Sequence, residues 1–393
     1  MSGKNKNYKA RRIGKLVLLV CEIFILVGLA GFVYIWRSVD KIQKHETVKE
    51  NVGTHVSDEH LGINISEIPK ESVEIQKGYT SVALFGVDNL YNGHAESGNS
   101  DVILVASINN DTKDVKLVSI YRDTFLDTEP MSANNSLHKC NRAYHVGGAE
   151  QAIQMLNKSL DLDIHNYITV DFKAVTDVVN LLGGVEVDLT SSEVFYVNKH
   201  AKTTGKATGI TTTEISGAGV HLLDGTQATA YCRIRSTAGS DFKRAERQRR
   251  VINELVKKAK KCDINTLNSV INTVFPEIYT SYSNAELISL ASAMLDYELS
   301  DTVGFPFSKN AITLGKGIGA VVVPCDLASN VTALHKFLYD DENYVPSNTV
   351  QAYSSAIQTT SGMGINSGDN KGAVDGTGEV TLDDFDNETQ AAN

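Results

Sequence analysis

The segment from residue 16 to residue 36, "LVLLVCEIFILVGLAGFVYIW", constrains this chain more than any other part of it. Its 21 residues are apolar except for Glu22, and a helix needs about 20 apolar residues to cross the hydrocarbon core of a bilayer. A cleaved signal peptide is the alternative, but its apolar region would be only about 7–15 residues long. The segment is longer and lacks a clear small-x-small cleavage site. It therefore predicts a single retained transmembrane helix.

The charges on either side of this segment predict its orientation. Residues 1–15 carry six basic and no acidic side chains. Because basic flanks stay in the cytosol, we expect 1–15 to be a cytosolic tail and everything after Arg37 to lie outside the cell. Residues 37–78 are polar and irregular, as in an extracellular spacer next to the cell membrane. This topology excludes nucleic acid as a partner.

The far end of the chain supplies most of its negative charge. The formal net charge is −10, and residues 341–393 hold nine acidic residues and one lysine. This stretch is rich in Ser, Thr, Asn and Gly and has few large apolar residues to bury. The composition predicts a disordered acidic tail over 341–393.

Four cysteines follow the apolar segment: Cys140, Cys232, Cys262 and Cys325. An even number outside the cell permits two disulfides. One candidate pair is Cys140 with Cys232, and free buried thiols are the alternative. No two of these cysteines have the CxxC spacing of a metal knuckle.

Strand-like and helix-like patterns alternate from residue 79 onward. Short runs rich in Val, Ile and Leu predict strands at 80–88, 100–110, 114–123, 164–172, 184–189 and 318–324. Helices are expected at 147–160, 173–182, around 224–232, from 240 onward, at 284–295 and at 327–339. The alternation predicts an α/β fold with a mixed central sheet sandwiched between helices. We expect one domain over 79–340, with a mobile Thr- and Gly-rich loop at 190–220.

Arginine is unevenly distributed outside the predicted membrane span. Eight arginines follow Arg37, all within 122–250: Arg122, Arg142, Arg233, Arg235, Arg244, Arg247, Arg249 and Arg250. The planar guanidinium presents a fork of donors that suits phosphate better than the point charge of lysine. The distribution therefore indicates that these segments meet at a phosphate group; the alternative is that arginines are simply common in helices and strands.

The stretch "SDFKRAERQRR" at 240–250 separates these two interpretations. In a helix that begins at Ser240 or Asp241, Arg244 and Gln248 share a face with Val251 and Leu255. A stripe that continues into apolar residues predicts a buried site rather than a solvated face. Arg247 borders that stripe, and the other members of the charge run, Lys243, Arg249 and Arg250, are expected to be solvated. The first helical turn would also favour an anion.

Two aspartates end neighbouring predicted strands. Asp88 and Asp101 flank the polar loop 89–100. Mg²⁺ commonly takes one or two carboxylates and completes its shell with phosphate oxygens and water, although caps and turns would also explain the two residues. His94, His138 and His145 lack the spacing of a zinc site, and the chain has no GxSxG motif and no P-loop.

An ordered series of motifs resembles the LytR–CpsA–Psr family of membrane-anchored cell-wall assembly enzymes. The resemblance covers about 79–340 and runs through "LFGVDN", "NSDVILVASIN", "VSIYRDT", "KCNRAYHVGG", "VDFKAVTDVVNLLGGVEVDL", "LLDGTQATAYCRIR" and "GSDFKRAERQ". It implies a catalytic domain with a mixed sheet between helices and an apolar tunnel for a lipid. It also implies transfer of a glycopolymer, such as teichoic acid or capsular polysaccharide, from a polyprenyl-pyrophosphate carrier to a peptidoglycan sugar hydroxyl with Mg²⁺.

The same resemblance implies roles for individual residues. Asp88 and Asp101 match the aspartates associated with the metal. The expected substrate-binding residues are Arg122, Asn141, Arg233, Arg235, Asp241, Arg244 and Gln248, to which the helix geometry described above adds Arg247. Asp101, Arg122 and Arg244 are the expected catalytic residues, with Asp101 as the proposed base. The apolar faces of 150–160 and 173–182 are candidates for holding the lipid.

This sequence departs from the family pattern at one position of "SIYRD", where Tyr121 stands in place of the usual proline. Arg122 and Asp123 are kept, so the departure affects the strand end rather than the charged residues. The alternative function is a non-catalytic sensor of polyprenyl phosphates, which would need the arginines but not the acceptor chemistry.

Overall fold

The computed structural model describes residues 43–44, 57–87, 98–132, 136–235, 240–283, 286–287, 290, 293, 296–315 and 317–368. The anchor predicted at 16–36 and the end of the acidic tail lie outside these residues. Within the described part of the chain, no helix is both long enough and apolar enough to cross a membrane.

A seven-stranded mixed sheet forms the centre of the molecule. Its strands, in spatial order, are β1 (Gln43–Lys44), β10 (Tyr279–Thr280), β7 (Ile164–Val170), β2 (Tyr79–Val87), β3 (Ser100–Asn109), β4 (Asp114–Ile120) and β11 (Glu298–Phe305). β2 is parallel to β7 but antiparallel to β3, and β11 is parallel to β4. The predicted mixed sheet is therefore confirmed, and β2, β3, β4 and β7 lie where the apolar runs placed them.

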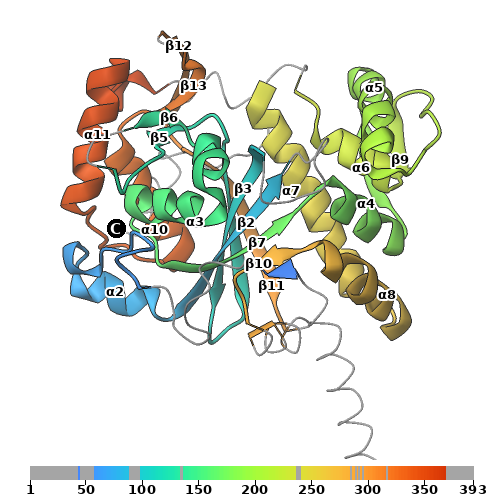
Figure 1. Cartoon of the computed structure of the whole chain (residues 1–393), viewed down its shortest axis with the longest axis horizontal. Coiled ribbons are helices and arrows are strands. Elements are labelled where there is room, and N and C mark those ends of the chain that lie inside the picture. The colour runs from blue at the N-terminus through green and yellow to red at the C-terminus, as the bar shows by residue number, and fades with distance from the viewer. Residues whose placement is uncertain are drawn as a thin grey trace, which may run out of the picture.

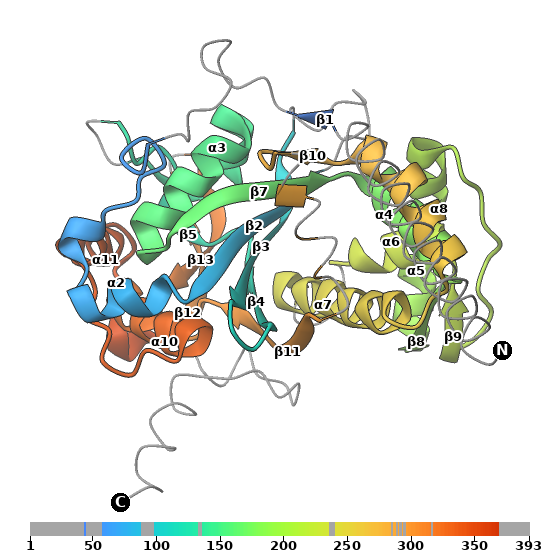
Figure 2. The same ribbon diagram turned by 90° about the horizontal axis from the view of Figure 1, so that it is seen from below.

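Helices cover both faces of the sheet, as the alternation predicted (Figure 1). Seen from below, α2, α3, α10 and α11 lie on one side and α4 to α8 on the other (Figure 2). The first group comprises α2 (Lys70–Gln76), α3 (Asn141–Leu160), α10 (Leu327–Tyr339) and α11 (Asn348–Ser361). The second comprises α4 (Phe172–Leu181), α5 (Ser191–Thr208), α6 (Gly225–Cys232), α7 (Ser240–Ala259) and α8 (Ile264–Val274).

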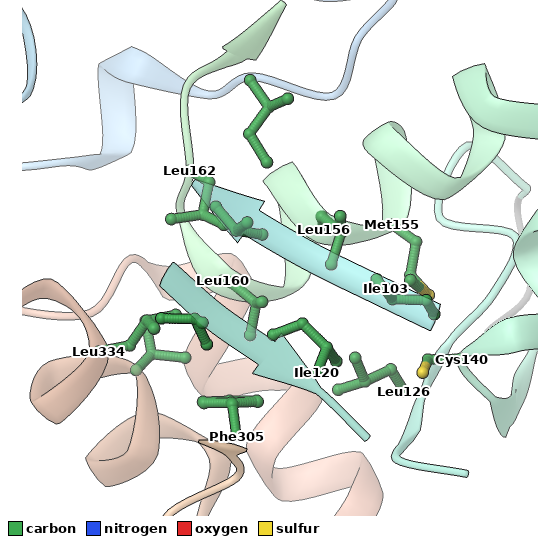
Figure 3. Packing of buried hydrophobic residues seen from close by; sticks show 14 of the residues in the cluster. Ile103, Ile120, Leu126, Cys140, Met155, Leu156, Leu160, Leu162, Phe305 and Leu334 are labelled. Carbon is green, nitrogen blue, oxygen red and sulfur yellow. The ribbon is translucent and has the colours of Figure 1, made fainter. Parts of the chain in front are cut away.

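Alternation along the strands supplies an apolar layer to each face. Ile103 and Val105 of β3 belong to the main core, whereas Leu104 and Ala106 belong to a smaller cluster on the opposite face. Figure 3 shows side chains from β3, β4, α3 and α10 meeting in the main core, with Leu334 on the α10 side. These side chains pack the sheet face against α3 and α10.

Among the described residues, three antiparallel strand pairs lie outside the central sheet. They are β5 (Phe125–Asp127) with β6 (Leu137–Lys139), β8 (Val185–Leu189) with β9 (Gly219–Leu223), and β12 (Lys309–Leu314) with β13 (Gly319–Pro324). The strands predicted at 184–189 and 318–324 exist, but they belong to these pairs. Gly147 and Gly148, expected to precede a helix, lie at a kink inside α3, where Gly148 has φ +68°.

The prediction of a mobile loop over 190–220 was wrong for its first half, which forms α5. Thr190 and Glu193 make a capping box, in which the Thr190 hydroxyl accepts from the Glu193 amide and the Glu193 carboxylate accepts from the Thr190 amide. Val194, Val197 and Ala201 then pack into a second core shared by α4, α5, α6 and the antiparallel pair of β8 and β9. These buried contacts hold the helix despite its Thr-rich composition.

The folded region extends beyond the expected 79–340 at both ends. Leu61, Ile63 and Ile68 of the predicted spacer are buried in the main core. Residues 348–361 of the predicted disordered tail form α11, whose Val350 and Ile357 are buried in the same core. Sparse apolar residues at the right spacing were enough to dock this segment, because the receiving surface came from α3 and α10.

A buried carboxylate also fixes the segment before α11. Asp161 ends α3 with φ +50° and is 4% exposed. It accepts hydrogen bonds from the Tyr344 hydroxyl, the Ser347 amide at 2.8 Å and the Ser347 hydroxyl at 2.7 Å. Burial raises the pKa of this carboxyl, and the three hydrogen bonds act in the opposite direction.

We expect Asp161→Ala to lower the free energy of unfolding by about 2 kcal/mol. Losing the acceptor leaves buried donors on Tyr344 and Ser347 unpaired, and the relief of the carboxylate's own burial offsets only part of that cost. Urea unfolding of the purified protein measures the change. Asp188→Ala, at an exposed position of β8, is the matched control and should change stability by less than about 0.5 kcal/mol. Equal effects of the two variants would contradict the role given to Asp161.

Candidate functional site

An apolar cavity lies between the second face of the sheet and the helices α4, α6 and α7. Its volume is about 470 Å³. The apolar lining comes from Leu84, Phe85, Gly86, Val87, Val102, Leu104, Ile168, Val170, Phe172, Val175, Val178, Val251, Ile252 and Leu255. An elongated apolar ligand fits such a lining, because each buried CH₂ group contributes about 0.8 kcal/mol.

Close backbone packing brings α6 to the wall of this cavity. A Cβ atom on Gly225, in the first turn of α6, would lie 2.0 Å from the Thr176 carbonyl oxygen of α4. Only glycine allows the two helices this approach. The helix therefore delivers Thr229, Cys232 and Arg233 at its other end to the cavity.

One end of the cavity is polar and carries Asp101, Arg233, Arg235, Arg244 and Gln248. Arg244 is only 4% exposed, and its Nη2 atom donates to the Asp101 carbonyl oxygen at 3.1 Å. Its Nη1 atom lies 3.9 Å from Asp101 Oδ2. Asp101 Oδ1 accepts from Nη1 of Arg122. The Asp101 residue thus orients two arginines that come from different elements.

A second carboxylate extends this charged network. Asp123 lies 3.8 Å from Nε of Arg122, 3.3 Å from Nζ of Lys139 and 3.6 Å from Nη2 of Arg235. Around Asp101 and Asp123 the described residues therefore bring four cationic side chains to two carboxylates. Among these described side chains the cationic groups outnumber the carboxylates, an arrangement that suits an anion.

The residues of the predicted stripe on α7 form one wall of the cavity. Arg244, Gln248, Val251 and Leu255 all line the cavity, and the Gln248 amide donates to the Cys232 carbonyl oxygen at 3.3 Å. This face of α7 therefore contributes polar side chains to the cavity up to Gln248 and apolar side chains after it.

Three other predicted residues, Arg122, Arg247 and Asn141, do not line the cavity, although Arg122 contacts the lining residue Asp101. Arg247 does not line it, because its Nε atom donates to Glu193 at 2.9 Å and its Nη1 atom to the Ile234 carbonyl oxygen at 3.2 Å. Burial opposes ionisation of Glu193, but bonds from Thr190 and Arg247 outweigh it and keep the pKa of that carboxyl below its usual value. Asn141 begins α3 with its amide donating to the Arg122 carbonyl oxygen at 3.1 Å.

The expectation of a solvated Arg249 was wrong. Its side chain is 5% exposed, whereas Arg250 is exposed as predicted. Arg249 lies on the α7 face of Phe242 and Ala245, which packs against Tyr121 and Val322. Arg249 is buried because α7 is covered on two sides. One face of the helix lines the cavity, and the face that carries Arg249 packs against the rest of the protein.

Two predicted residues cannot be placed. Asp88 and the side chain of Asp241 lie outside the described residues. Of the two segments expected to hold a lipid, 173–182 lines the cavity through Val175 and Val178. Residues 150–160 do not, because α3 packs in the main core on the opposite face of the sheet.

The cysteines do not form the expected bridge. Cys140, Cys232, Cys262 and Cys325 are all free. The Cys140 thiol donates to the carbonyl oxygens of Tyr121 and Arg122, so it holds the loop that carries Arg122. Cys232 lies in the cavity wall, where burial raises the pKa of its thiol to about 12 and keeps it protonated.

Sequence reasoning missed the contribution of α5 to the site. His200 lines the cavity, and burial together with the charges of Arg233 and Lys199 lowers the pKa of its imidazole. Thr203 and Thr204, one turn later, contact Arg233. The capping-box pattern "TSSE" at 190–193 was the available signal for this helix.

An apolar chamber with cationic lining residues, built on a mixed sheet between helices, has the shape and charge that suit an amphiphilic anion. Residues 39–313 match the LytR_cpsA_psr family, which is more than half of the chain. The chain belongs to this family.

Two relatives carry names that describe one activity. The chain is 34% identical over 205 residues to the polyisoprenyl-teichoic acid–peptidoglycan teichoic acid transferase TagU of Enterococcus faecalis, a match covering 52% of this chain and 59% of that protein. It is 25% identical over 327 residues to the corresponding transferase TagV of Bacillus subtilis, covering 78% and 77%.

Solved structures share the fold. The crystal structure of Bacillus subtilis TagV superposes with a TM-score of 0.52 and 23% identity, covering 69% of this chain and 99% of that one. A crystal structure of a Streptococcus agalactiae protein gives 0.53 and 23%, covering 70% and 92%.

Proposed function

We propose that this chain is a transferase that moves a glycopolymer from a polyprenyl-pyrophosphate carrier to a peptidoglycan sugar hydroxyl. The observation that carries the proposal is the cavity, in which an apolar chamber of about 470 Å³ ends at Arg233, Arg235 and Arg244. A polyprenyl pyrophosphate has the same division, with an apolar tail and a doubly charged head. The names of the relatives, which specify teichoic acid transfer, support the reaction class.

The proposed reaction is a phosphoryl transfer. The acceptor hydroxyl oxygen forms a bond to the phosphorus that carries the glycopolymer, and the bond from that phosphorus to the bridging oxygen breaks. Polyprenyl phosphate leaves with the bond's electron pair, and the hydroxyl proton goes to a carboxylate. Arginines held in place before the substrate arrives stabilise the developing charge without having to reorganise.

Asp101 is the proposed base, because its carboxylate lines the cavity beside Arg244. Arg122 and Arg244 keep Asp101 in one orientation through the contacts described above. A general base must lie within hydrogen-bond reach of the proton that it removes. The acceptor sugar is therefore proposed to approach Asp101 from the cavity side.

Mg²⁺ is the proposed cofactor. The described residues contain no group of three or more His, Cys, Asp or Glu side chains able to hold a metal ion. Mg²⁺ needs only one or two protein carboxylates when phosphate oxygens complete its shell, so Asp101 at the charged end fits this donor chemistry, with Asp88 as the second proposed ligand. When bound, the ion would neutralise phosphate charge.

We also propose that residues 16–36 anchor the chain in the cell membrane with the domain outside. The support is the length and composition of the segment and the six basic residues before it. A reporter fused after residue 393 and found in the cytosol would overturn this topology.

Turnover of a defined substrate tests the function. The full-length protein is incubated with a polyprenyl-pyrophosphoryl oligosaccharide, Mg²⁺ and peptidoglycan fragments. We expect a glycan–phosphate–peptidoglycan product by mass spectrometry, with release of one polyprenyl phosphate for each product formed. We expect chelation of divalent cations to reduce the rate and re-addition of Mg²⁺ to restore it. Lipid binding without product, where a family relative turns over, would support the sensor alternative instead.

A further inference from the structure

The side chain of Arg233 contacts uncharged polar side chains of helix α5. Arg233 is the residue at which α6 ends, and its Nη1 atom donates to the hydroxyl oxygens of Thr203 at 3.1 Å and Thr204 at 2.9 Å. Its guanidinium carbon lies 4.7 Å from the centroid of the Phe172 ring. Two hydroxyl groups and one aromatic face therefore contact the guanidinium fork.

We propose that Thr204 is a positioning residue for Arg233, and that α5 thereby holds this arginine ready for the pyrophosphate head of the substrate. The inference rests on the proposed function, because it assigns Arg233 a ligand. Thr204 carries more of this role than Thr203, because its side chain is fully buried whereas Thr203 is exposed.

The chemistry of the contact suits this purpose. An Nη1 group has two N–H donors, and the two threonine hydroxyls accept both of them. Hydroxyl oxygens orient a guanidinium without cancelling its charge, whereas a carboxylate partner would oppose binding of an anion. Phe172 adds a face-on contact with the cation, which favours one orientation of the planar group.

Preorganisation explains why the contact would matter for binding. A free arginine side chain loses rotamer entropy when a ligand orders it, and a side chain fixed beforehand avoids most of that cost. Arg244 is fixed by Asp101 on α7's side of the cavity, and Arg233 by Thr204 on α5's side. Both arginines thus reach the charged end in fixed positions.

Three variants of the full-length protein test the proposal, with geranylgeranyl diphosphate as the probe. Thr204→Val removes the hydroxyl and keeps the shape, and we expect about tenfold weaker binding, as for a lost hydrogen bond to a charged group. Thr204→Ser keeps the hydroxyl and should bind within about twofold of the native protein. Thr226→Val is the matched control, since Thr226 is equally buried and its hydroxyl donates only to the Ile210 carbonyl oxygen at 3.0 Å.

A double-mutant cycle separates positioning from a general loss of structure. If Thr204 acts through Arg233, Thr204→Val will have no further effect on affinity in an Arg233→Ala background. If it weakens that background about as much as it weakens the native protein, the positioning role is overturned. Thermal unfolding of Thr204→Val and Thr226→Val should show similar losses, although only the first changes affinity.

The outcomes also distinguish this inference from the proposed function. If Arg233→Ala binds the diphosphate as well as the native protein does, the assignment of the charged end to pyrophosphate fails. If Arg233→Ala weakens binding but Thr204→Val does not, the proposed function stands and the positioning role fails.

Discussion

Replacing Arg244 by alanine should reduce the rate of glycopolymer transfer at least about 10³-fold. The guanidinium is 4% exposed and lies at the charged end of the cavity, where a fixed cation stabilises charge that develops on a transferring phosphoryl group. Removing a single preorganised donor of this kind typically costs about 10²–10³ in rate, and an arginine at phosphoryl transfer can be worth more. The loss is measured as kcat/KM for product formation in the assay described above.

Two further variants test whether this loss is specific. Arg244→Lys keeps the charge but not the fork that contacts the Asp101 carbonyl oxygen, so we expect it to recover only part of the activity. Arg250→Ala removes an exposed arginine of the same helix, paired with Glu246 at 3.3 Å. It should retain nearly full activity. If Arg250→Ala and Arg244→Ala lose activity equally, the assignment of the α7 faces is wrong.

Arg249 cannot serve as that control, although its sequence position suggested that it would. Its side chain is 5% exposed, so its removal would test packing as well as charge. The comparison of Arg249 with Arg250 shows why a charge run has to be divided residue by residue before a matched control is chosen.

The central sheet and the cavity-facing side of α7 could be predicted because their signals are local. Alternating Val, Ile and Leu in β2 and β3 reports burial on two faces, and a helix period of 3.6 places Arg244, Gln248 and Val251 together. Neither inference needs to know which distant segment forms the other wall.

Features that depend on pairing between distant segments could not be predicted in the same way. A strand at 184–189 was expected, but nothing in its sequence specifies that it pairs with β9 outside the central sheet. Similarly, the sequence places Arg247 beside the stripe on α7. Its side chain instead donates to Glu193 on α5, a contact between segments that are distant in the sequence. Both outcomes depend on tertiary contacts.

Composition misled where a few residues carried the structure. Residues 190–208 are rich in Thr and polar groups, yet Thr190 and Glu193 cap a helix that supplies Thr204 to the site. The acidic region after 341 contains few apolar residues, but Tyr344 and Val350 are enough to dock it on α3 and α10. In both cases spacing was more informative than average polarity.

Filling the apolar chamber should separate lipid binding from phosphate binding. Val175 of α4 lines the cavity, and a tryptophan at this position would occupy part of the roughly 470 Å³ that is available to a lipid tail. Displacing about 110 Å² of lipid surface at 25 cal/mol per Å² corresponds to about 100-fold weaker binding. We therefore expect Val175→Trp to weaken binding of a polyprenyl diphosphate about 100-fold, measured by calorimetry.

Inorganic pyrophosphate provides the second measurement on the same variant. Its affinity should be nearly unchanged in Val175→Trp, because the substitution removes neither a charge nor a hydrogen-bonding group. Stability should not fall much either, since the new side chain enters a cavity rather than a packed core. Val220→Trp, at a position of β9 that is 64% exposed, controls for the substitution itself and should bind both probes normally. If Val175→Trp binds the lipid as tightly as the native protein, this cavity does not hold the carrier's tail, even if the arginines still bind its phosphates.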